Sequence, residues 1–232
     1  MTTALLQTTY FGPVQWYQKL NRYDRCIIEQ YDNYQKQTYR NRCVIATANG
    51  LQALTVPVEA SRQLGAADNG KCLVRDVRIS DHNQWRRVHW NALQSAYSES
   101  PFFEYYADDL HPFFEQKYVF LTDFNEAIRE KVCQLLDIHP KVVHSSQFSV
   151  VTTDKPAGSR NAPLKSAQSP QEGQQPVADD FREVISAKHP LPDPDFTPRS
   201  YWQVFQRRHG FLPNLSILDL LFNMGPESIF YL

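Results

Sequence analysis

The chain has 232 residues, of which 42% are hydrophobic, and a formal net charge of -1 at pH 7. This length supports a real hydrophobic core in one large domain or two small ones. A nearly neutral chain produces no field that gathers a polyanion, so the composition disfavours nucleic-acid binding.

Four cysteines, Cys26, Cys43, Cys72 and Cys133, lie far apart and form no CxxC pair. Such spacing is typical of reduced thiols in a core, so we expect a reducing, cytoplasmic compartment. The N-terminal residues do not resemble a signal peptide, and no apolar run approaches the length of a membrane span. We therefore expect a soluble protein that does not insert into a membrane.

The first elements predict an α/β layer. Ala4–Thr9 reads as a strand, Val14–Arg22 as an amphipathic helix and Arg25–Gln30 as a second strand. A strand, helix and strand in this order favour a parallel pair. Ligands of such sheets bind outside the carboxyl ends of the strands, which here fall near 7–10 and 30–33.

A cationic loop and a predicted β-hairpin follow in residues 33–57. The loop contains Lys36, Arg40 and Arg42 among tyrosines and amides, and Asn49-Gly50 suits a type I′ turn between two strands. A cationic loop on a rigid ribbon could hold an anionic small molecule. An ordinary solvated loop has the same composition, so the pattern leaves both interpretations open.

The middle of the chain predicts a strand at Val74–Ile79 and a helix at Asp81–Tyr97. His82 and His89 share one face of that helix, but zinc-binding helices place their histidines three to five residues apart. We therefore expect no metal. A histidine on this face is either a hydrogen-bonded core group or, for His89, a residue of the active site.

Two further strands are predicted at Val119–Thr122 and Lys141–Ser149, separated by a helix that ends near Leu136. His144 and Ser145 would point to opposite faces of the second strand, which excludes them as a catalytic pair. Ser146 remains a candidate polar site residue.

The domain organisation follows from a change in composition. Residues 1–150 form the predicted α/β core, and residues 151–200 are rich in proline, with few large hydrophobic residues before Phe181. Such a segment predicts a loop or disordered insert. Residues 201–232 recover an apolar pattern and are expected to pack back on the core. Their helix, capped by Asn214 or Ser216, carries Asp219 and Asn223 one turn apart.

The chain resembles the WbqC-like family of bacterial proteins, which is associated with surface-polysaccharide genes such as those for O-antigen. Four blocks carry the resemblance, together with HSSQF at 144–148: LLQTTYFGPVQWYQKL at 5–20, KQTYRNR with NGLQALTVPV at 36–58, ISDHNQWRRVHWNALQSAYSESPFF at 79–103, and FLPNLSILDLLFNMGPES at 211–228. The resemblance implies these polar motif positions: Gln7, Tyr10, Lys36, Asn41, Arg42, Trp85, His89, Trp90, Ser145, Ser146, Asp219 and Asn223.

From these residues we expect a cytoplasmic α/β enzyme of one Rossmann-like domain, with a hairpin extension and a largely irregular insert. Its expected reaction is group transfer, as a transferase of polysaccharide biosynthesis acting on a sugar, nucleotide-sugar or related anionic small molecule. Lys36 and Arg42 would bind phosphate or carboxylate, and His89 would be the general base.

The other expected contacts come from amide, hydroxyl and carboxylate groups. Gln7 and Asn223 would orient the acceptor, and Asp219 would orient a basic partner. Tyr10, Asn41 and Ser146 complete the predicted binding set. The alternative is a non-catalytic binding or assembly protein of the same pathway, in which His89, Asp219 and Asn223 are satisfied core groups. The sequence assigns no cofactor, and it leaves open a homo-oligomer or a pathway protein as a partner.

Overall fold

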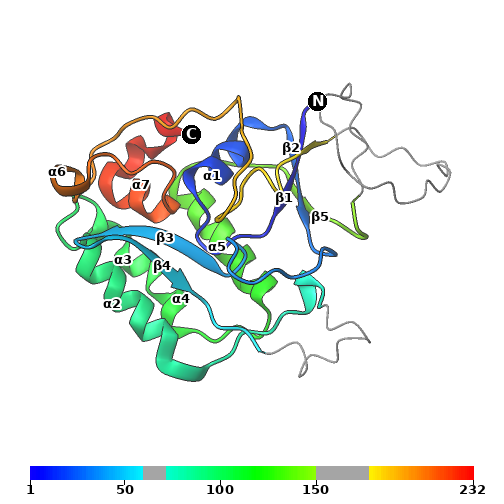
Figure 1. The fold of residues 1–232 in the computed structure, drawn as a ribbon, viewed down its shortest axis with the longest axis horizontal. Coiled ribbons are helices and arrows are strands. Elements are labelled where there is room, and N and C mark those ends of the chain that lie inside the picture. Colours follow the sequence, from blue (N-terminus) through cyan, green and yellow to red (C-terminus); the bar gives the residue numbers. More distant parts are fainter. Residues whose placement is uncertain (60–71, 150–177) are drawn as a thin grey trace.

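A parallel β-sheet organises the fold, as the computed structural model in Figure 1 shows for residues 1–59, 72–149 and 178–232. Its strands are β1 (Thr3–Gln7), β2 (Arg25–Glu29), β5 (Val142–His144) and β6 (Asp179–Asp180), and they lie in the order β5-β2-β1-β6. All three neighbouring pairs are parallel. The prediction of an α/β fold with a parallel sheet is thereby confirmed.

The first crossover is the predicted strand, helix and strand unit. Helix α1 (Val14–Arg22) connects β1 to β2, which pair in register from Thr3 opposite Arg25 to Gln7 opposite Glu29. Pro13 precedes α1 and favours its start, because proline lacks the N–H that an early helical position leaves unpaired. The two strands therefore end side by side, and their carboxyl ends form one edge of the sheet.

The fourth strand was not predicted. Residues 150–177, which make up most of the predicted insert, lie outside the described part of the chain. Within its remainder, Asp179 and Asp180 pair with Ala4 and Leu5 of β1, and Phe181 and Ile185 are buried in the main core. Asp179 and Asp180 thus supply one edge strand of the sheet.

The predicted hairpin is confirmed as β3 (Arg42–Thr47) and β4 (Gly50–Thr55), which pair antiparallel. Its predicted turn is wrong by one residue. Thr47 pairs with Gly50, so Ala48 and Asn49 form the loop, and Gly50 has a φ of 102° whereas Asn49 has no positive φ. A type I′ turn requires positive φ at both loop residues, so glycine serves here at the first strand position instead.

Two predicted strands are also wrong. Val74–Asp76 forms a short 3₁₀ helix, although Ile79 makes an isolated bridge to Val58. In the segment predicted as Val119–Thr122, Phe120 bridges to Arg78 and helix α5 begins at Leu121. Residues 74–79 alternate apolar and polar side chains and residues 119–122 form a short apolar run, but the two segments meet only in the single bridge between Arg78 and Phe120.

The remaining helices follow the apolar patterns closely. Helix α2 starts at Trp85 rather than at Asp81, because Asn83 and Gln84 have positive φ and interrupt the helical path. At α7, Ser216 is the N-cap, and Gly225 ends the helix with a φ of 54°, as predicted. The bounds are α2 Trp85–Tyr97, α3 Phe103–Leu110, α4 Pro112–Glu115, α5 Leu121–Leu135, α6 Gln206–His209 and α7 Ile217–Met224, with a 3₁₀ helix at Gly225–Tyr231.

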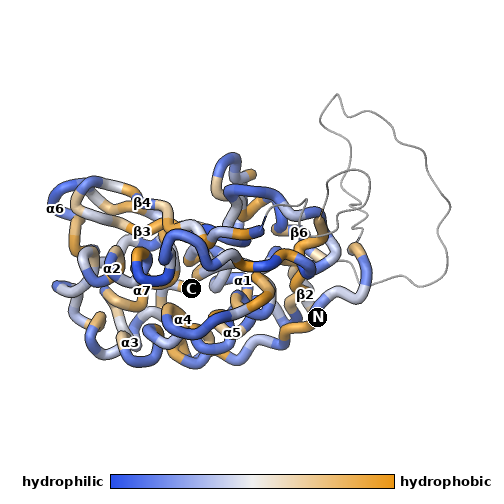
Figure 2. The backbone as a smooth tube through the Cα atoms, turned by 90° about the horizontal axis from the view of Figure 1, so that it is seen from below, coloured by the Kyte–Doolittle hydropathy of each residue, from blue (hydrophilic) through white to orange (hydrophobic). Residues whose placement is uncertain are grey.

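The main hydrophobic core lies on one face of the sheet. Leu6 and Ile28 enter this core, whereas Leu5 and Ile27 belong to a small cluster on the other face. Figure 2 shows hydrophobic residues recurring along β2, while the hydrophilic α6 lies at one end of the molecule. All four cysteines are buried free thiols, as expected. No helix in the described ranges has the length and hydrophobicity needed to cross a membrane.

Candidate functional site

A polar cavity of about 580 Å³ opens at the carboxyl edge of the sheet. Gln7 ends β1 and Asp180 ends β6, so the cavity lies where these two neighbouring strands finish. The loop after β2 supplies its opposite wall. The lining consists of Gln7, Asp32, Gln35, Thr38, Arg40, Phe148, Asp180, Arg182, Glu183, Val184, Ser186, His189 and Leu191.

The topology explains why a cavity forms here. From β1 the sheet extends through β2 to β5 in one direction, whereas β6 lies on the other side of β1. Connections that leave toward opposite sides of the sheet open a crevice at the strand between them, and open α/β sheets bind ligands in that crevice. The cavity includes Gln7 and Asp32, which belong to the two strand ends where the sequence places a ligand.

Arg182 is fixed by two carboxylates. Its Nε donates to Asp180 Oδ1 at 3.0 Å, and its Nη2 donates to Asp180 Oδ2 at 2.7 Å. On the other side its Nη1 lies 3.6 Å from Glu29 Oε2. Because the fork is bidentate, the guanidinium plane has a defined orientation at the edge of the cavity.

Glu29 is a buried carboxylate, and both of its oxygens accept hydrogen bonds. It accepts hydrogen bonds from the backbone N–H groups of Tyr31 at 2.8 Å and Ser149 at 2.9 Å, and from Ser145 Oγ at 2.7 Å. Burial alone would raise its pKa, but these hydrogen bonds outweigh burial and lower the pKa below its ordinary value. Glu29 is therefore an ionised anchor beneath the cavity wall.

Arg40 forms the opposite cationic wall. It is only 3% exposed, and its Nη2 lies 2.5 Å from Asp32 Oδ2. Burial lowers the pKa of Arg40, an effect that Asp32 partly offsets and the charge of Arg182 reinforces. The Arg40 carbonyl accepts a hydrogen bond from Asn125 Nδ2 at 2.8 Å, which ties this loop to α5.

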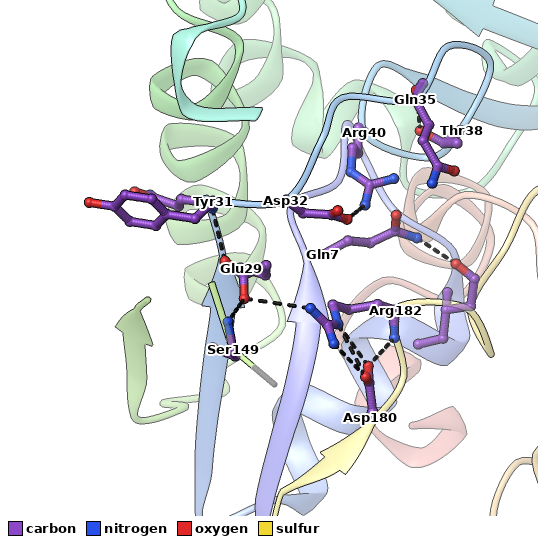
Figure 3. A network of polar contacts seen from close by, with 12 residues as sticks. Gln7, Glu29, Tyr31, Asp32, Gln35, Thr38, Arg40, Ser149, Asp180 and Arg182 are labelled. Atoms are coloured by element: carbon purple, nitrogen blue, oxygen red, sulfur yellow. Dashed lines mark hydrogen bonds and ion pairs between the residues drawn. The ribbon is translucent and has the colours of Figure 1, made fainter. Parts of the chain in front are cut away.

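Gln7 lies between the two arginine pairs. Figure 3 shows its side chain between Arg40 with Asp32 and Arg182 with Asp180. Gln7 Nε2 donates to the Ile185 carbonyl at 2.5 Å, so the amide is held by the chain that follows β6. The end of β1 thus presents a polar floor flanked by two guanidinium–carboxylate pairs.

Comparison with known protein families identifies the family of this chain. The model of the WbqC-like protein family matches residues 7–231. The chain belongs to the WbqC-like protein family. A curated relative, "Uncharacterized protein Rv1507c" of Mycobacterium tuberculosis (strain ATCC 25618 / H37Rv), is 28% identical over 240 residues, which cover 99% of this chain and 96% of the relative. No solved structure matches the chain significantly.

Among the motif positions of this WbqC-like chain, His89 and Tyr10 lie inside the core. The Tyr10 hydroxyl and His89 Nδ1 are 2.9 Å apart, and the His89 ring packs edge-on against Trp85. His89 is 4% exposed, and burial lowers its pKa to about 4. Its imidazole is therefore neutral at pH 7, and neither His89 nor Tyr10 lines the cavity.

Asp219 is the centre of a second buried cluster. It accepts hydrogen bonds from Tyr97 Oη at 2.8 Å, Tyr201 Oη at 2.7 Å and Gln203 Nε2 at 2.8 Å. Burial raises the pKa of Asp219, and these donors oppose that rise. Asn223 Nδ2 donates to the Asp219 carbonyl at 2.7 Å, so both predicted residues of α7 are engaged within the core.

The remaining predicted residues also lie outside the cavity lining. Lys36 and Ser146 are exposed, whereas Asn41 is buried and donates to the Val56 carbonyl at 2.9 Å. Arg42 is half-buried, and its Nε donates to Thr55 Oγ1 at 3.2 Å across the hairpin. Of the predicted set, Gln7 is the residue that lines the cavity.

The sequence interpretation missed Asp32, Arg40, Asp180 and Arg182. Two signals for them were present: Asp32 directly follows a predicted strand end, and Arg40 belongs to the cationic loop. Asp180 and Arg182 lay in the segment interpreted as an insert, where no local pattern predicts a strand. In the described ranges, no group of three or more metal-binding side chains is arranged to hold an ion.

Proposed function

We propose that this WbqC-like protein binds a sugar or nucleotide-sugar in the cavity at the end of β1 and modifies it by group transfer. The observation that supports the proposal is the cavity itself, with paired donors and acceptors at the ligand-binding edge of an α/β sheet. Its role in surface-polysaccharide biosynthesis is part of the same proposal and follows from the family resemblance.

The chemistry of the lining suits a hydroxyl-rich ring. A hydroxyl both donates and accepts hydrogen bonds, whereas a guanidinium only donates and an ionised carboxylate only accepts. Each arginine–aspartate pair therefore offers complementary partners for neighbouring hydroxyls. Phe148 and Leu191 are half-exposed at the cavity and supply apolar surface for the C–H face of such a ring.

Thermal-shift measurements with neutral sugars, sugar phosphates, nucleotide sugars and acyl-coenzyme A compounds test this proposal. A ligand that binds the native state raises the melting temperature by mass action. We expect a sugar-containing class to raise it by a few degrees, because 1 kcal/mol of stabilisation corresponds to about 2–4 °C in a chain of this length.

Arg40→Ala and Arg42→Ala form a matched pair for locating the site. Both variants remove one arginine near the start of β3. Arg40 lines the cavity, whereas Arg42 donates a hydrogen bond to Thr55. We expect the ligand response to disappear in Arg40→Ala and to persist in Arg42→Ala. A response that disappears in Arg42→Ala alone would instead support the phosphate-binding role expected from the sequence.

A second candidate function is a non-catalytic binding or assembly protein. The observation that favours it is the burial of His89 and Asp219, whose side chains are hydrogen-bonded within the core. A chain that responds to none of the tested small molecules but forms a stable complex with another protein of its pathway would support this second function. We propose that His89 and Asp219 act through the stability of the core under either function.

A further inference from the structure

The charge balance of the cavity narrows the ligand class. Three carboxylates line it, those of Asp32, Asp180 and Glu183, against two guanidinium groups. Glu29 adds a fourth carboxylate behind Arg182. The other titratable group of the lining is the imidazole of His189. Four carboxylates thus face two guanidinium groups, and the described part of the site carries an excess of negative charge.

Arg182 contributes little attraction for an anion, because its charge is already shared. Asp180 holds two of its nitrogens, at 3.0 and 2.7 Å, and Glu29 lies 3.6 Å from the third. An anionic ligand would have to compete with both carboxylates for one guanidinium. Removing Arg182 from them would leave Glu29, which is 1% exposed, as a buried carboxylate without its cation.

Asp32 has the opposite character. Arg40 Nη2 bonds one of its oxygens, and no other side chain of the described residues donates to Asp32. Its side chain is 20% exposed and lines the cavity, so the second oxygen has acceptor capacity on the cavity side. Glu183 is exposed at the rim and forms no ion pair within the described residues.

We infer that the ligand carries a positively charged amino group into the cavity, where it is bound by Asp32 and attracted by Glu183. An ammonium group has three hydrogen-bond donors and no acceptor. It can donate to the Asp32 oxygen that Arg40 does not bond, beside the Gln7 side chain. The inference rests on the proposed sugar-binding function and specifies it: the sugar ring that enters the cavity carries an ammonium group rather than a carboxylate.

Three sugars that share one ring test the inference directly. D-glucosamine, D-glucose and D-glucuronate differ in charge at pH 7, and their affinities for the full chain can be compared by thermal shift and by titration calorimetry. We expect glucosamine to bind about three- to five-fold more tightly than glucose, the gain of a solvent-accessible ion pair near 1 kcal/mol. Glucuronate should bind more weakly than glucose.

Two variants show whether the carboxylates cause this order. Asp32→Asn keeps the shape but removes the charge, so it should abolish the advantage of glucosamine over glucose. Glu183→Gln at the exposed rim should reduce that advantage without affecting folding, which circular dichroism checks for both variants. Asp32→Asn could disturb the Arg40 loop, and the Glu183 variant then provides the independent test.

Different failures identify different errors. If glucose binds as tightly as glucosamine, or glucuronate binds best, the inferred amino group is wrong while sugar binding stands. If none of the three sugars binds at tens of millimolar and no other sugar of the panel does, the proposed function fails and the inference falls with it. An advantage of glucosamine that survives in both variants also contradicts the inference.

Discussion

Two clusters of polar side chains in the described part of the chain differ in their access to solvent. The cavity at the carboxyl edge of the sheet opens to solvent, whereas the cluster around Asp219 is closed. In the closed cluster, the carboxylate has three side-chain donors and 0% exposure. In the open cluster, Asp32 has one side-chain donor among the described residues.

This difference shows how structural and ligand-binding polar groups can be told apart. A buried group must satisfy its hydrogen bonds within the protein, because a missing partner costs about 1–3 kcal/mol. A group beside a cavity can leave capacity for a ligand. We therefore propose that His89 and Asp219 belong to the scaffold and that Arg40, Asp32 and Gln7 belong to the ligand site. Asn223 satisfies the criterion only in part, because its Nδ2 donates to the Asp219 carbonyl but its buried Oδ1 has no partner among the described residues.

The largest expected effect breaks the closed cluster. Asp219→Ala leaves the Tyr97 and Tyr201 hydroxyls and the Gln203 amide without their acceptor. We expect the free energy of unfolding to fall by about 3–5 kcal/mol, because each buried donor left without its acceptor costs about 1–3 kcal/mol, and urea denaturation measures this loss. Asp219→Asn is the matched control, and it should cost less because an amide keeps one acceptor oxygen. Equal stability of Asp219→Ala and the unmodified protein would refute the structural role.

A comparable loss is expected at the support of the cavity wall. Lys19 is 1% exposed on α1, its Nζ lies 2.7 Å from Asp193 Oδ2, and it also lies over the Phe181 ring. Lys19→Met leaves the Asp193 carboxylate without its cation, although Gln15 Nε2 and the Asp195 N–H still donate to it, and should cost about 3 kcal/mol. The double variant Lys19→Met with Asp193→Asn removes both charges and should recover part of this loss. No recovery would show that packing, rather than charge pairing, fixes residues 178–200.

A smaller effect concerns the pH dependence of stability. His89 has its pKa lowered to about 4 by burial, whereas an unfolded chain gives histidine its ordinary value near 6.5. The unfolded state therefore binds more protons between these values. The contribution of neutral His89 to the free energy of unfolding is complete above about pH 6.5. It falls by about 2–3 kcal/mol as the pH is lowered toward 4.

Denaturation curves between pH 4 and 7.5 measure this dependence. His89→Gln removes the titrating imidazole, so its stability should change less across the same range than that of the unmodified protein. If stability changed with pH equally in His89→Gln and in the unmodified protein, other groups would cause the pH dependence. The folded state would then not lower the pKa of His89.

Local patterns predicted the elements that their own residues determine. The pairing of β1 with β2, the hairpin and the cap and stop of α7 follow from apolar spacing and from residues such as Ser216 and Gly225. Residues 179–180 form a strand only because β1 lies beside them. No pattern within two aspartates contains that information.

The site was harder to predict because its partners are distant in sequence. Arg182 is positioned by Glu29, and Lys19 by Asp193, through contacts that form only in the folded chain. Charged residues usually remain exposed, so the burial of Lys19 and Arg40 has no local signal. The family resemblance located the motif blocks in the sequence. Which polar groups line a cavity and which bond to one another depends on the three-dimensional fold.

Amide hydrogen exchange with the tightest sugar of the panel compares the two clusters most directly. At saturating ligand and short exchange times, we predict added protection in residues 32–40 and 179–191, which contribute the cavity walls. Residues 85–97 and 216–224, which carry His89 and Asp219, should change little. Protection confined to those two helices, with the cavity walls unchanged, would contradict the assignment of the open cluster as the ligand site.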